Sequence, residues 1–141
     1  MDGHWTGVPT IEGSASNEMW VESSPRVSLR VIEWVPDSPA NEAPVVFVPG
    51  WGSVFEGWRP LIEEWARHRR IVYIETREKG SSRIEGNISK SDFTVDCLNT
   101  DIAAVLESLG IESKDVDWFS SSLGSTLLID AFQKGRLSGR T

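Results

Sequence analysis

The segment Ser-Ser-Ser-Leu-Gly-Ser at residues 120–125 has the residue types and spacing of a nucleophile-bearing turn. It follows a strand-like apolar run and precedes a helix-forming one. In the pattern small-x-Ser-x-small, set here by Ser120, Ser122 and Gly124, the small flanking residues let a strand reverse sharply into a helix. The central serine then sits on a strained turn, with its hydroxyl exposed above the helix N-terminus. The spacing therefore predicts that Ser122 is a nucleophile.

This turn resembles the nucleophile elbow of the alpha/beta-hydrolase superfamily. Ser122 aligns with the elbow nucleophile of that family, and Ser120 stands where the family usually has its first glycine. Serine keeps the small size and loses some of the conformational freedom of glycine.

The resemblance extends to the segment Pro-Gly-Trp-Gly at residues 49–52, which matches the His-Gly-x-x loop of the family with proline in place of histidine. It implies an oxyanion hole made of two backbone N–H groups, those of Trp51 and Leu123. Gly50 and Gly52 let the loop turn its N–H group inward. The loss of one such donor costs about 3 kcal/mol of transition-state stabilisation.

A third match is the loop at residues 75–82, which resembles the Asp-x-Arg-Gly-x-Gly-x-Ser segment of the family. Arg77, Gly80 and Ser82 are kept, whereas Glu75 replaces the aspartate and Glu78 replaces the first glycine. The likeness thus runs from about residue 20 to residue 135, which is the first half of a hydrolase domain.

The resemblance implies a serine hydrolase (esterase-, lipase- or thioesterase-like) or an acyltransferase, working through an acyl-enzyme on Ser122. The expected partner is a small-molecule acyl substrate, namely an ester, thioester, lactone or amide, and we expect no cofactor and no metal. In this family the triad follows the order Ser, Asp or Glu, His. After Ser122 the sequence has one acid, Asp130, and no histidine. We therefore expect residues 19–141 to be the N-terminal part of such a domain, truncated after the elbow helix and inactive alone.

Two alternatives stay open. The first is a non-catalytic relative that keeps the serine without a triad. The second is a dinucleotide-binding module, since Gly50-x-Gly52 follows a buried strand and Glu75 ends the next one. That fingerprint lacks its third glycine, because Phe55 occupies the position. No Walker-type phosphate loop occurs in the sequence.

The remaining residues capable of chemistry have structural interpretations. His68 precedes the serine and lies among arginines, so we interpret it as a solvated residue at a helix end. His4 falls in a polar N-terminal stretch, residues 1–18, which we interpret as a flexible leader. Cys97 lies beside an apolar helical stripe and is interpreted as a small hydrophobic residue.

Composition indicates a soluble protein with an acidic surface. Fourteen basic and 21 acidic residues give a net charge of −7, which argues against a nucleic acid or an anionic membrane as partner. No apolar run reaches the ~18 residues that span a bilayer. The N-terminus lacks the apolar segment of a secretory signal. With a single cysteine no intramolecular disulfide can form, so we expect a cytoplasmic protein.

The hydrophobic pattern predicts an α/β fold with a doubly wound, mostly parallel sheet and an antiparallel N-terminal hairpin. The resemblance implies that this is the incomplete core of an alpha/beta-hydrolase. The strands at 45–48 and 71–74 read as buried on both faces, and the resemblance implies that 45–48 lies centrally between 71–74 and 116–119. Ser53 and Glu56 have the spacing of a capping box for the first helix. The outer edge of the 116–119 strand should be open, which predicts self-association through that edge. The ranges expected as strands are 19–22, 27–35, 45–48, 71–74 and 116–119, and helices are expected from 53 to 65, around 98–109 and from about 124 to 134.

Overall fold

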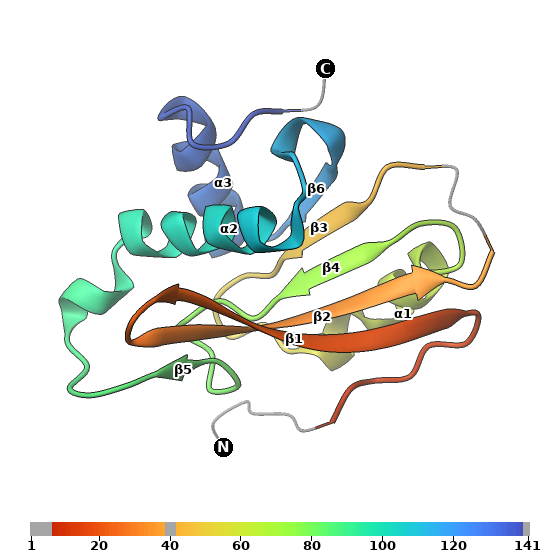
Figure 1. The fold of residues 1–141 in the computed structure, drawn as a ribbon, viewed down its shortest axis with the longest axis horizontal. Helices are drawn as coiled ribbons and strands as arrows, with labels where there is room; N and C mark the ends of the chain where they lie inside the picture. The colour runs from red at the N-terminus through yellow and green to blue at the C-terminus, as the bar shows by residue number, and fades with distance from the viewer. Residues whose placement is uncertain (1–6, 39–41, 140–141) are drawn as a thin grey trace.

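The computed structural model describes residues 7–38 and 42–139, which form one mixed six-stranded sheet with helices on both faces (Figure 1). The strand order is β1-β2-β4-β3-β6, and β5 pairs with β2 off this path. The strands are β1 (Ser14–Ser24), β2 (Val27–Pro36), β3 (Val45–Val48), β4 (Ile71–Ile74), β5 (Arg83–Ile84) and β6 (Asp117–Ser120). The helices are α1 (Phe55–Trp65), α2 (Val95–Leu109) and α3 (Leu123–Gln133), with short 3-10 turns η1 (Lys90–Phe93) and η2 (Ser113–Asp115).

Strand β3 lies at the centre of a parallel set, between β4 and β6, as the sequence predicts. Val45 is the register partner of both Ile71 and Asp117, so the three strands begin at one edge of the sheet. Val48 pairs with Ser120 at the other edge, so the carboxyl ends of β3 and β6 lie side by side. The α/β class is confirmed, and this second edge is where open parallel sheets bind ligands.

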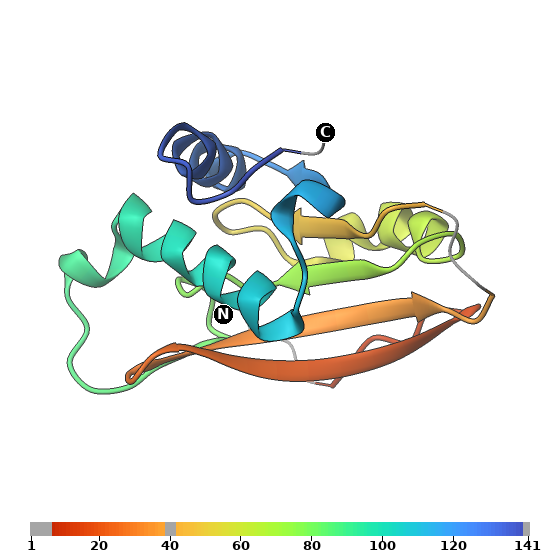
Figure 2. The ribbon, with the colours of Figure 1, turned by 45° about the horizontal axis from the view of Figure 1, so that its top comes forward.

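The two faces of the sheet are covered by different helices (Figure 2). Side chains alternate between faces along a strand. Val46 and Val48 of β3 therefore pack into the cluster that contains α2 and α3 residues, whereas Phe47 packs into the cluster that contains α1. Since β3 is buried on both faces, its uninterrupted apolar run is explained.

Helix α1 forms where the sequence predicts a helix and packs aromatic residues on the sheet, but the predicted capping box is wrong. Trp58 and Trp65 pack edge-on against Phe47, with ring centroids 5.5 and 6.4 Å apart. The residue that caps the helix is Val54 rather than Ser53, and no side chain caps it. The helix begins at Phe55, later than the capping-box spacing indicates, because this buried residue makes the first contact with the sheet.

Helix α2 ends where the sequence predicts. Gly110 adopts a left-handed conformation with φ 67°, which costs glycine little. The N–H groups of Gly110 and Ile111 then donate to the carbonyls of Glu107 and Leu106, at 3.1 and 2.9 Å.

Two expectations for the antiparallel part need correction. The flexible leader predicted over 1–18 overlaps β1, which begins at Ser14 and runs antiparallel to β2 far beyond the short edge strand expected at 19–22. Residues 1–6, including His4, lie outside the described part. The strand β5 was not predicted; it pairs antiparallel with β2 and lies outside the parallel set of β4, β3 and β6.

Across residues 7–38 and 42–139, none of the helices combines the length and the apolar character that crossing a bilayer requires.

Candidate active site

The connection between β6 and α3 has the geometry of a nucleophile elbow. Ser122 has φ 51° and ψ −114°, and among the described residues it alone combines a positive φ with a side chain. Such a conformation costs about 1–3 kcal/mol and persists only where its surroundings impose it. Ser122 is exposed, directly before the first residue of α3. A strained, exposed serine at a strand-to-helix turn is the arrangement that the spacing predicts.

Small residues are required around this turn because it lies directly against β3. A Cβ atom added to Gly124 would lie 2.1 Å from the carbonyl oxygen of Val48. Ser120, the first small residue of the pattern, has its hydroxyl oxygen 2.8 Å from that of Ser125. This hydrogen bond joins the end of β6 to the first turn of α3. A glycine at position 120 has no hydroxyl and could not form it.

The loop after β3 reaches the same place. A Cβ atom on Gly50 would lie 2.7 Å from the Ser121 carbonyl oxygen and 3.0 Å from Cβ of Ser122. The Ser53 N–H donates to the Gly50 carbonyl at 3.1 Å, and Gly52 has φ 70°, so residues 50–53 form a tight turn beside the serine. The structure thus brings together Ser122 and the loop that the sequence selects.

The two residues expected to supply oxyanion donors both belong to these segments. Trp51 is the second residue of the 50–53 turn, and it is 69% exposed, so the role expected of it is one of its backbone N–H. Leu123 opens α3, where N–H groups have no partner inside their own helix. Helix α1 leaves β3 on one face of the sheet and α3 leaves β6 on the other, which is the topological switch point where such sheets bind ligands.

The loop after β4 supports this edge of the sheet. Arg77 donates to both carboxylate oxygens of Asp101 in α2, each at 2.7 Å, and both side chains are buried. The hydrogen bonds to Asp101 raise the pKa of Arg77 further. Ser82 accepts the N–H of Arg30 at 3.0 Å and donates to the Glu75 carbonyl at 2.7 Å. Sequence reasoning selected Arg77 and Ser82 but missed Asp101, whose only signal is an acid on the apolar side of a helix.

The surroundings of Glu75 and Phe55 weigh against a dinucleotide site. The Glu75 side chain is 2% exposed, and its carboxylate accepts the Ser81 hydroxyl at 2.6 Å. It is therefore not presented to a ribose. Phe55 stacks on Trp34 at 5.4 Å in the core, where the fingerprint requires a glycine.

The base and acid of a triad do not accompany Ser122 within the described residues. His68 follows α1 at the opposite edge of the sheet, 61% exposed and with its Nε2 3.8 Å from a Glu64 oxygen. Asp130 points from α3 to Lys134 and Asn99, which bind its carboxylate. Cys97 lies half-buried against the α2 cluster. In the described ranges no three His, Cys, Asp or Glu side chains group closely enough to hold a metal ion.

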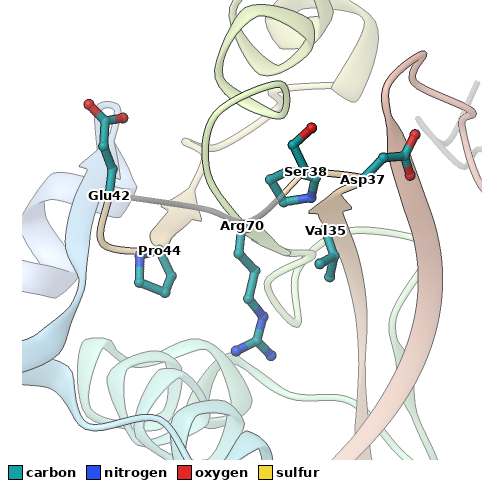
Figure 3. Close-up of a pocket in the computed structure, with 7 residues that line it drawn as sticks. Val35, Asp37, Ser38, Glu42, Pro44 and Arg70 are labelled. Atoms are coloured by element: carbon teal, nitrogen blue, oxygen red, sulfur yellow. The ribbon is translucent and has the colours of Figure 1, made fainter.

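Two hollows lie on the described part of the molecule. The larger, about 520 Å³, lies at the amino ends of β3 and β4, away from the elbow (Figure 3). A smaller one of about 140 Å³ lies between the loop after β3 and the loop after β4, beside the elbow. The larger hollow lies away from Ser122, so the strained serine and the loop after β3, rather than volume, define the candidate site. The larger hollow is lined by Val35, Pro36, Asp37, Ser38, Glu42, Pro44 and Arg70.

Comparison with solved structures identifies the fold. An epoxide hydrolase from Vigna radiata is 22% identical, with a TM-score of 0.66 over 92% of this chain and 38% of its own. A proline iminopeptidase-related protein from Thermus thermophilus is 20% identical, with a TM-score of 0.70 over 89% of this chain and 43% of its own. Epoxide hydrolase A from Mycobacterium thermoresistibile is 18% identical, with a TM-score of 0.64 over 87% of this chain and 37% of its own.

These relatives are alpha/beta-hydrolase structures, so the chain has the fold of the N-terminal part of an alpha/beta-hydrolase domain. It spans about two fifths of the length of the solved structures that it matches. No protein-family model and no curated protein sequence matches it.

Proposed function

We propose that this chain carries the nucleophile and the oxyanion donors of a serine hydrolase or acyltransferase. The observation that carries the proposal is the strained, exposed Ser122 between β6 and α3, held against the glycine loop that follows β3. Strained backbone at a nucleophile positions its hydroxyl before substrate arrives.

In the proposed reaction the Ser122 Oγ attacks a substrate carbonyl carbon while a base takes the hydroxyl proton. The carbonyl oxygen becomes an oxyanion, which the Trp51 and Leu123 N–H groups stabilise by hydrogen bonds. Collapse of this intermediate returns the proton to the leaving alcohol, thiol or amine and leaves an acyl-serine. Water then hydrolyses the acyl-serine, or another acceptor takes the acyl group. Esters, thioesters, lactones and amides all fit this sequence.

The general base is the part of the reaction that the described residues do not place beside Ser122. A serine hydroxyl is a weak nucleophile at its own pKa and needs such a base. Since the described residues place no such base beside Ser122, we expect the purified chain to turn over substrate negligibly, with added imidazole serving as the base in part.

The competing proposal is a non-catalytic relative, which the exposed position of His68, far from the elbow, favours. Acyl-serine formation separates the two. The purified chain is incubated with activated ester, thioester, lactone and amide, with and without imidazole, and its intact mass is followed. Because solved structures with this fold include epoxide hydrolases, an epoxide completes the set.

The proposal predicts one acyl group per chain, formed faster with imidazole and lost in Ser122→Ala. The matched control is Ser121→Ala, one residue away, which should keep the acylation. Acylation that is equal in Ser122→Ala and Ser121→Ala would refute the proposed nucleophile.

A further inference from the structure

Lys79 is a buried cation beside the proposed oxyanion loop, in the loop that follows β4. Its side chain is 8% exposed, and its Nζ donates to the Gly50 carbonyl oxygen at 3.1 Å. The same ammonium donates to the Thr76 hydroxyl at 3.0 Å and lies 3.5 Å from a carboxylate oxygen of Glu78. A buried ammonium is held only where its charge and its donors find partners. The contact with Gly50 is therefore a fixed part of the fold.

The Gly50 carbonyl and the Trp51 N–H belong to the same peptide unit. A trans peptide is planar, and its C=O and N–H point in opposite directions. The structure has no cis peptide in its described part. Whatever fixes the direction of the Gly50 carbonyl consequently fixes the direction of the Trp51 N–H. Lys79 holds this oxygen from the β4 loop, and the Ser53 N–H holds it at 3.1 Å from within the turn.

We propose that Lys79 is a positioning residue of the site, which orients the Gly50–Trp51 peptide so that the Trp51 N–H serves as an oxyanion donor. This inference rests on the proposed function of Ser122. The ammonium acts through the peptide and does not touch the substrate. Its hydrogen bond is charge-assisted, hence stronger than one between neutral groups. It also polarises the peptide, because hydrogen bonds in series strengthen one another.

The proposed role of Lys79 also explains the presence of Glu78 beside it. Glu78 stands where the resemblance expects a glycine, so its carboxylate is a feature of this chain that the resemblance does not explain. Its side chain is 4% exposed, and it accepts the Thr76 hydroxyl at 2.6 Å while facing the Lys79 ammonium. Thr76 thus links both charges. Glu78 and Thr76 together hold the ammonium beneath Gly50, which explains an acid at this position.

The first test is spectroscopic and needs no activity. In ¹H–¹⁵N spectra of the purified chain, Lys79→Met should shift the Trp51 amide resonance, since the polarising hydrogen bond to its peptide is lost. Because Lys79→Met leaves Glu78 buried without a counter-charge, the double variant Lys79→Met/Glu78→Gln is measured as well. Lys134→Met is the matched control, since it also removes one ion-paired ammonium. A Trp51 resonance that moves no more in the Lys79 variants than in the control overturns the proposal.

The second test measures acylation of Ser122 by a chromogenic ester with imidazole present, in protein shown to be folded by circular dichroism. Loss of a whole oxyanion donor lowers the rate ~10²–10³-fold, so misdirecting one should lower it about tenfold or more. In both Lys79 variants we expect this decrease in the acylation rate at saturating ester, with the half-saturating ester concentration unchanged. A purely structural role would lower stability and leave the rate of folded protein unchanged.

The two proposals fail in different ways. If Ser122→Ala acylates like the unmodified chain, the proposed nucleophile is wrong, while the Trp51 resonance still decides whether Lys79 orients the peptide. If Ser122→Ala abolishes acylation but both Lys79 variants match Lys134→Met, Ser122 stands and the role of Lys79 is wrong.

Discussion

Adding one methyl group to each of two helical glycines should change the free energy of unfolding in opposite directions. Gly124, in the first turn of α3, would place a Cβ atom 2.1 Å from the carbonyl oxygen of Val48 and 3.0 Å from its carbon. Gly57, near the start of α1, has no heavy atom within 4 Å of the same added atom. The two substitutions to alanine are chemically identical, and only their surroundings differ.

The magnitude at Gly124 follows from what must move. The neighbours are backbone atoms of β3, so no side chain can rotate away, and the strand and helix must separate by about 1 Å. Overpacking of this kind costs ~1–3 kcal/mol, against a helix-propensity gain of up to ~1 kcal/mol. We expect Gly124→Ala to lower the free energy of unfolding by about 2 kcal/mol at most once the propensity gain is included. We expect Gly57→Ala to raise it by about 0.5–1 kcal/mol.

Equilibrium urea unfolding of the purified chain, followed by tryptophan fluorescence, measures both changes. The same separation of β6–α3 from β3 should move Ser122 away from Gly50, so Gly124→Ala should also slow acylation of Ser122. If Gly124→Ala is as stable as Gly57→Ala and as reactive as the unmodified chain, the elbow does not lie against β3 as described.

Three further predictions concern other parts of the molecule. Asp101→Asn leaves the Arg77 guanidinium buried without its counter-charge and should cost about 3 kcal/mol or more in urea unfolding, whereas Asp115→Asn, on an exposed turn, should cost little. The hydrogen bond from Lys134 lowers the pKa of Asp96 in the folded protein. The contribution of Asp96 to stability is therefore present above about pH 4, its pKa in the unfolded chain, and is lost as the pH falls through the lower pKa of the folded protein. Asp96→Asn should flatten the dependence of the free energy of unfolding on pH in this range. An unchanged slope would contradict the pairing of Asp96 with Lys134. Strand β6 pairs only with β3 among the described strands, so size-exclusion chromatography should show concentration-dependent self-association, and a monomer at all concentrations would contradict an adhesive edge.

The sequence was most informative where local chemistry and burial agree. The apolar run at 45–48 predicted β3 and its burial on both faces, because only a strand covered on both faces lacks polar alternation, whereas its central place came from the resemblance. The elbow was predictable because close contact with Val48 leaves room for no side chain at Gly124. The end of α2 at residue 109 was predictable for a similarly local reason, because Gly110 takes the left-handed conformation that ends the helix.

The features that the sequence did not predict depend on distant partners. Ser53 and Glu56 satisfied the local pattern of a capping box, but the docking of Phe55 on the core set the start of α1. The two-residue strand β5 has no periodicity to detect and exists through pairing with β2. Asp101 and Lys79 are, respectively, 24 and 29 residues from the partners that define their roles, Arg77 and Gly50. No local pattern connects such pairs.

The central claim, that Ser122 is a nucleophile facing a preformed oxyanion hole, is tested most directly by a crystal structure of the chain after reaction with a fluorophosphonate and imidazole. We expect phosphorus bonded to the Ser122 Oγ. We also expect a phosphonyl oxygen ~2.7–3.1 Å from the backbone nitrogens of Trp51 and Leu123. An adduct on another residue, the absence of any adduct on Ser122, or a phosphonyl oxygen turned away from both nitrogens would contradict it.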